Sequence, residues 1–171
     1  MSVGGEALTE DPRHRRIWQA LAEVEDPEIP YVTILDLGIV RAVTDDEAGN
    51  PVVRITPTYT GCPATRLIEL QIRAALDRVG FPHARIETVL SPPWTTDWIT
   101  EEGRRKLQEA GIAPPVAGSG RAALFGGGPE VACPRCGSTD TERLAEFGST
   151  ACKALYRCRC CREPFEYFKC L

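Results

Sequence analysis

The sequence Cys133-Pro134-Arg135-Cys136 is a Cys-x-x-Cys pair, and a second pair follows as Cys158-Arg159-Cys160-Cys161. Residues 137–157 separate the two pairs. Two Cys-x-x-Cys pairs can place four thiolates tetrahedrally around one metal ion where few apolar side chains are available for a core. A site closed by four cysteines holds a structural metal, so we expect a β-rich zinc ribbon over residues 131–171, with iron as the alternative metal. The predicted ligands are Cys133, Cys136, Cys158 and Cys161.

Three further cysteines in this region have no assigned role. Cys160 adjoins Cys161 and is the alternative ligand, although Cys161 reproduces the spacing of the first pair. Cys152 and Cys170 are open to three interpretations: buried thiols, a second pair of soft-metal ligands, or a redox pair.

Composition limits the class of protein. The chain has 171 residues, 43% of them hydrophobic, with a net charge of -4; residues 1–112 hold 12 Lys and Arg against 18 Asp and Glu. Without a strongly basic face, nucleic-acid binding is disfavoured. No apolar run approaches the roughly 18 residues that a membrane helix needs, and the N-terminus is charged, so we expect no membrane association and a cytoplasmic location. In the reducing cytosol, thiols are expected to bind metal rather than form disulfides.

Residues 1–112 predict an α+β domain with the element order α-β-β-α-β-α. Asp11-Pro12 is typical of a helix start, and the strongest helical periodicity follows Cys62-Pro63 and ends at Gly80. A segment rich in Pro and Gly, residues 113–130, has the composition of a linker to the ribbon. The expected helices are 12–25, 63–79 and 100–110, and the expected strands are 39–43, 52–56 and 85–90.

Cys62 stands apart from the other cysteines, immediately before a predicted helix. Backbone N–H groups and the positive end of the helix dipole favour a thiolate there, which is a better nucleophile or soft-metal ligand. Thr58 and Thr60 can add hydroxyl donors nearby. The competing interpretation is a small buried hydrophobic residue. One thiolate cannot hold a metal firmly by itself.

Four motifs in residues 1–112 resemble, in order, the SufT-like family of small iron–sulfur assembly domains. The motifs are Asp26-Pro27-Glu28-Ile29-Pro30, Ile34-Leu35-Asp36-Leu37-Gly38-Ile39-Val40, Pro57-Thr58-Tyr59-Thr60-Gly61-Cys62-Pro63 and Ser91-Pro92-Pro93-Trp94. The resemblance implies that Cys62 is the functional cysteine, binding iron or a cluster transiently. It also places Asp26, Glu28 and Asp36 at acidic loop positions beside it, although all three have ordinary roles in turns and at the surface.

Two segments of the C-terminal region, 147–158 and 163–170, extend the resemblance to the PaaD-type family of the bacterial phenylacetyl-CoA epoxidase system. This implies an accessory protein of phenylacetate catabolism, not itself an enzyme, that assists iron or iron–sulfur centre assembly in the oxygenase or its reductase. A homodimer that completes the Cys62 site is a further expectation.

Three other functions remain open at this stage. A scaffold component of the oxygenase complex would not need Cys62. A thiol oxidoreductase would use Cys152 or Cys160. A nucleic-acid-binding ribbon would use Arg135, Arg143, Arg157, Arg159 and Arg162.

Overall fold

The computed structural model describes residues 11–116 and 130–169, which divide into two compact units between Trp94 and Thr95. The predicted linker, residues 113–130, lies mostly outside the described residues. The first unit contains α1 (Pro12–Leu21), β1 (Val40–Asp45), β2 (Pro51–Ile55), α2 (Ala64–Arg78) and β3 (Arg85–Thr88). The second contains a short 3-10 helix (Thr96–Trp98), α3 (Glu101–Glu109), β4 (Ile112–Ala113), β5 (Thr141–Ala145), β6 (Lys153–Cys158) and β7 (Pro164–Phe168).

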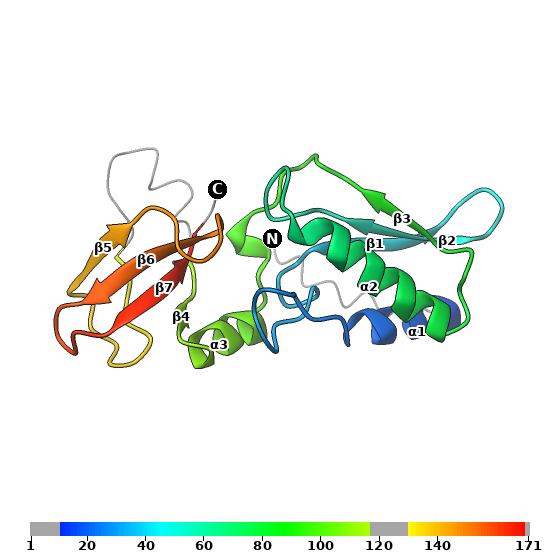
Figure 1. Ribbon diagram of the computed structural model, residues 1–171. Helices are drawn as coiled ribbons and strands as arrows, with labels where there is room; N and C mark the ends of the chain where they lie inside the picture. Colours follow the sequence, from blue (N-terminus) through cyan, green and yellow to red (C-terminus); the bar gives the residue numbers. More distant parts are fainter. Residues whose placement is uncertain (1–10, 117–129, 170–171) are drawn as a thin grey trace. The chain divides into compact units, whose positions relative to one another are not determined.

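The first unit is a three-stranded sheet with helices packed on it. β1 pairs with β2 antiparallel and β2 pairs with β3 parallel. Figure 1 shows α2 crossing one face of this sheet with α1 beside it. Their apolar faces are buried, because leucine and isoleucine recur at helical spacing along both helices. The core residues include Ile17, Leu21, Val53, Ile55, Ile68, Ile72 and Leu76.

Local signals set the ends of the helices. Asp11 caps α1 by accepting the Arg13 N–H at 2.7 Å, and Thr100 caps α3 by accepting the Gly103 N–H at 2.9 Å. α1 ends at Leu21, earlier than the predicted residue 25, because the following chain turns to pair Glu25 with Thr33.

The second unit contains the predicted β-rich ribbon. Its sheet has the order β4-β7-β6-β5, with β4 parallel to β7 and the other pairs antiparallel. β4 includes Ala113, the first residue of the predicted linker. The second unit begins at Thr95 and so includes α3, whereas the predicted domain boundary at residue 112 places α3 in the first domain.

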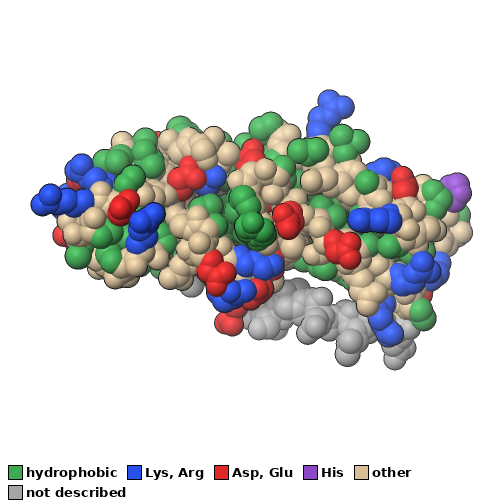
Figure 2. Space-filling model, turned by 60° about the horizontal axis from the view of Figure 1, so that its bottom comes forward, with side chains coloured by type: hydrophobic (Ala, Val, Ile, Leu, Met, Phe, Trp, Pro, Cys, Tyr) green, Lys and Arg blue, Asp and Glu red, His purple; other side chains and the backbone are tan. Residues whose placement is uncertain are grey.

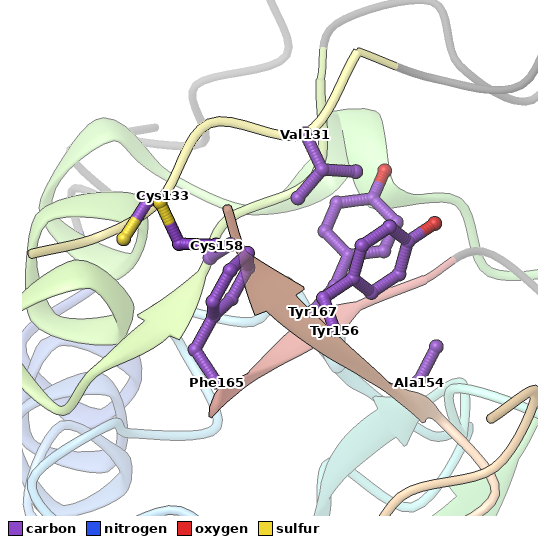
Figure 3. Packing of buried hydrophobic residues seen from close by; sticks show 8 residues of the cluster. Val131, Cys133, Ala154, Tyr156, Cys158, Phe165 and Tyr167 are labelled. Atoms are coloured by element: carbon purple, nitrogen blue, oxygen red, sulfur yellow. The ribbon is translucent and has the colours of Figure 1, made fainter. Parts of the chain in front are cut away.

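An aromatic core lies beside two of the ribbon cysteines. Figure 3 shows Tyr156, Phe165 and Tyr167 packed close to Cys133 and Cys158, with Val131 above them. The Tyr156 and Phe165 rings stack at 5.9 Å between centroids, and Tyr167 meets Tyr156 edge-on at 5.6 Å.

Two apolar residues of the ribbon lie outside this core. Leu144 and Phe147 are candidates for the core by residue type, but they are 49% and 60% exposed. Tyr156 and Tyr167 are buried in the core instead.

Candidate functional site

Four cysteines converge at one end of the ribbon. The sulfurs of Cys133, Cys136, Cys158 and Cys161 all lie within 4.8 Å of one another. The closest contacts join the two knuckles: Cys133 Sγ is 3.7 Å from Cys161 Sγ, and Cys136 Sγ is 3.5 Å from Cys158 Sγ. The two Cys-x-x-Cys turns, far apart in sequence, therefore form one tetrathiol cluster.

The spacing of the cluster suits zinc. Tetrahedral zinc with sulfur ligands at about 2.3 Å requires sulfurs roughly 3.8 Å apart. The two closest sulfur–sulfur distances, 3.5 and 3.7 Å, are near that value. The residues present therefore fit a closed four-sulfur site without rearrangement of the backbone.

The electrostatics of the cluster also favour a bound cation. The Cys161 N–H donates to Cys158 Sγ at 3.5 Å and lowers the pKa of Cys158 to about 7. The Ser138 N–H alone would lower the pKa of Cys136, but the neighbouring thiols and burial outweigh it and raise that pKa to about 12. Four thiolates at this spacing repel one another unless a metal ion neutralises them.

The remaining ribbon cysteines lie outside the cluster. Cys160 is exposed, and its neighbour Cys161 supplies the fourth sulfur. Cys152 is buried, with its Sγ 3.1 Å from Thr150 Oγ1. Cys170 lies outside the described residues. Every cysteine that the structure describes is a free thiol rather than half of a disulfide.

Cys62 lies at the turn that leads into α2. Pro63 occupies the N-cap position, so Cys62 is one residue before the cap. Its N–H donates to the Tyr59 carbonyl at 3.3 Å, and its own carbonyl accepts the Thr65 N–H at 3.1 Å. Gly61, at φ +84°, makes the turn in a backbone region that favours glycine. Cys62 is half-buried, neither sealed in the core nor fully exposed.

Two of the carboxylates predicted beside Cys62 accept backbone hydrogen bonds from nearby residues. Asp26 Oδ1 accepts the N–H groups of Glu28 at 2.8 Å and Ile29 at 3.1 Å, which builds the turn that the Asp-Pro pair predicts. Asp36, buried at 8% exposure, accepts the Thr33 N–H at 2.9 Å while its own N–H donates to Thr33 Oγ1 at 3.1 Å.

The Cys62 turn supplies few ligands of its own. Within residues 11–116 and 130–169, no group of three closely spaced Cys, His, Asp or Glu ligands includes Cys62. Thr58 is half-buried and Thr60 is exposed, and no hydrogen bond joins either hydroxyl to the Cys62 sulfur in this part of the chain.

A second group of metal-ligating side chains is not predictable from the sequence. Asp11, His14 and Asp45 have ligand atoms within 4.8 Å of one another. Arg13 occupies both carboxylates, with its Nη2 2.9 Å from Asp11 and 2.9 Å from Asp45, and His14 Nε2 is 3.1 Å from Asp45. Because a guanidinium already neutralises the carboxylates, the group is an ion-pair network rather than a cation site. The sequence predicts Asp11 as a helix cap, but its long-range partner Asp45 has no such signal.

The arginines of the ribbon are mostly paired, which disfavours nucleic-acid binding. The face shown in Figure 2 intersperses Lys and Arg with Asp and Glu. A guanidinium that is already paired with a carboxylate gains less free energy on binding a phosphate. The pairs are Arg135–Glu163, Arg143–Glu146, Arg157–Glu142 and Arg159–Glu142. Separately, none of the described helices has the length and apolar character to cross a membrane.

Two family models match the two parts of the chain. The family described as iron-sulfur cluster assembly protein matches residues 14–89, and the PaaD zinc beta ribbon domain matches residues 117–169. A solved domain of unknown function, DUF59, from Bacillus anthracis aligns with a TM-score of 0.50 and 30% identity over 56% of this chain and 91% of its own.

Two relatives cover different shares of the chain. An Escherichia coli protein provisionally named as one of the subunits of 1,2-phenylacetyl-CoA epoxidase is 52% identical over 94% of each chain. The Fe-S protein maturation auxiliary factor YitW of Bacillus subtilis is 36% identical over 57% of this chain and 96% of its own.

The fold and the tetrathiol ribbon define a protein that joins an iron–sulfur assembly domain to a zinc ribbon. Within that class, the chain belongs to the PaaD-type family of phenylacetyl-CoA epoxidase proteins. The resemblances to an iron–sulfur assembly domain and to the PaaD-type family, both noted from the sequence, are confirmed.

Proposed function

We propose that this chain is a non-catalytic maturation factor that assists iron or iron–sulfur centre assembly in the oxygenase or reductase of a phenylacetyl-CoA epoxidase system. The observation that carries the proposal is the half-buried Cys62 at the start of α2, in a domain whose relatives include proteins named Fe-S maturation factors. The Escherichia coli relative, named for the epoxidase, supports the epoxidase context. Both partner proteins and this chain would meet in the cytoplasm, where thiols remain reduced.

In this mechanism Cys62 holds its cargo only transiently. Sulfur is a ligand that soft cations and clusters favour, but one sulfur cannot retain them against exchange. The other ligands of the iron or cluster come from the acceptor during transfer, or from a second copy of the chain before transfer. The candidate polar neighbours of the cargo are Asp26, Glu28, Asp36, Thr58 and Thr60, and the Asp26 and Asp36 carboxylates also shape the neighbouring loop. Transfer then follows as acceptor ligands replace the Cys62 sulfur.

The ribbon has a structural role in this proposal. Cys133, Cys136, Cys158 and Cys161 hold one zinc ion per chain, and all four coordination positions are taken by protein sulfur, so none remains open for chemistry. Zinc bound there fixes the two knuckles against the aromatic core described above.

Zinc affinity should depend steeply on pH. Because the pKa of Cys136 is about 12 without metal, zinc must displace at least that proton. Lowering the pH from about 8 to about 6 should therefore weaken zinc binding at least about tenfold per pH unit. Competition with a chromophoric chelator measures the affinity. An affinity that does not change over this range would contradict a site of deprotonated thiols.

Co-expression tests the function itself. The oxygenase and reductase are produced with or without this chain, and the iron and sulfide in each purified acceptor are counted. The proposal expects at least one acceptor to be under-loaded when the chain is absent. Equal loading of both acceptors with and without the chain would defeat the maturation function and leave a scaffold role, which requires only complex formation.

A further inference from the structure

Helix α2 carries a second apolar face, turned away from the core. Its inward residues Ile68, Ile72 and Leu76 are buried. On its other side, Leu67 is 46% exposed and Leu70 is 67% exposed. Ala74, also exposed, continues the same line, since residues at i, i+3 and i+7 share one side of a helix. We call Leu67, Leu70 and Ala74 the outer stripe of α2.

An exposed arginine lies beside the outer stripe, in a unit whose net charge is negative. Segment 1–94 holds 9 Lys and Arg against 14 Asp and Glu, whereas α2 holds three arginines against two carboxylates. Arg73 is paired with Asp77, and Arg78 lies 3.8 Å from Glu23. Arg66, one helical turn before Leu70, is exposed and has no ion-pair partner among the described residues.

We propose that the outer stripe is the docking surface for the acceptor protein, which binds it through an amphipathic segment whose apolar side chains are flanked by Asp or Glu. This inference rests on the proposed function and names how its partner is recognised. Apolar contact supplies the affinity, and the unpaired Arg66 guanidinium selects an acidic rim.

The charge distribution favours an acceptor over a second copy of the chain. Two outer stripes packed against each other would bring two Arg66 guanidinium groups into one interface, and neither has an ion-pair partner among the described residues. Like charges across an interface oppose association. An acidic partner segment instead gains a charge-assisted contact at the same position.

The stripe is also well placed for transfer. Leu67 and Leu70 follow Cys62 by five and eight residues, which is within roughly 12 Å along a helix that rises about 1.5 Å per residue. A partner bound to the stripe therefore lies close to the cysteine proposed to deliver the cargo. Docking and delivery occupy neighbouring but separate residues, so they can be tested separately.

Site-specific crosslinking tests the partner. A benzophenone amino acid replaces Leu70 in the full chain, which is co-expressed with the oxygenase and reductase proteins. Leu90, 54% exposed in the same unit, is the matched control position. We expect position 70 to crosslink to one of these proteins and position 90 not to do so. Crosslinking of position 70 to a second copy of the chain, or to none of these proteins, would overturn the proposal.

Affinity measurements separate docking from delivery. Leu70→Glu should weaken binding to the crosslinked protein at least about tenfold, and Leu90→Glu should leave it unchanged. Arg66→Glu or added salt should also weaken it. Cys62→Ala should bind normally but deliver no iron. Unchanged affinity of Leu70→Glu would overturn the docking surface alone, whereas specific docking without iron delivery by the wild type would overturn the proposed function alone.

Discussion

Replacing Cys62 with alanine is expected to leave the co-expressed oxygenase and reductase with no more iron than they acquire in cells that lack this chain. Cys62 is half-buried at the turn before α2. Among the described residues, it belongs to no group of three closely spaced metal-ligating side chains. In the proposed mechanism, this substitution removes the sulfur that holds the cargo. Iron and sulfide are counted in each purified acceptor.

The same experiment needs a second thiol variant as its control. Cys160 is exposed and lies outside the tetrathiol cluster, so Cys160→Ser should preserve wild-type loading. Cys62→Ala should also retain zinc and an unchanged far-ultraviolet circular dichroism spectrum, since its sulfur makes no hydrogen bond within the described residues. Wild-type loading by the Cys62 variant would show that the chain acts by docking alone.

The second large effect is expected in the ribbon. Cys161→Ser should abolish stable zinc binding and unfold the ribbon, because it removes a sulfur that lies 3.7 Å from Cys133. Structural zinc in small thiolate domains contributes on the order of 10 kcal/mol to folding. The aromatic core of this ribbon offers little to replace that contribution. Elemental analysis should find about one zinc per chain in the wild type and close to none in the variant.

Cys160→Ser is the matched control for this prediction as well. It should keep the zinc and the protease resistance of the ribbon, because the sulfur of Cys161, and not that of Cys160, belongs to the cluster. Zinc lost from Cys160→Ser but retained by Cys161→Ser would assign the fourth ligand to Cys160 and contradict the geometry described above.

Much of the fold is predictable because its signals are local. α2 is marked by Ile68, Ile72 and Leu76 at helical spacing, and by Gly80, whose φ of +88° ends the turn. The pairing of β4 with β7 is not predictable in this way, since it joins segments separated by the whole ribbon. The early end of α1 likewise depends on a contact of Glu25 with Thr33 beyond the helix.

The site shows the same division between local and distant information. Cys-x-x-Cys spacing indicates the knuckles and favours Cys161 over Cys160, and the fold places the Cys161 sulfur in the cluster while Cys160 is exposed. The outer stripe of α2 is not predictable either, because sequence periodicity marks Leu67 and Leu70 as apolar without showing that they remain exposed. His14 has no role that the sequence predicts, yet it contacts Asp45 in the fold.

Transfer between purified proteins tests the central claim most directly. Wild-type chain and the Cys62→Ala variant are loaded anaerobically with radioactive iron and sulfide, mixed with apo-acceptor in the presence of an excess of iron chelator, and separated. We expect iron to reach the acceptor from the wild type despite the chelator, and not from the variant. Equal delivery from both proteins, or delivery blocked by the chelator in both, would contradict transfer through Cys62.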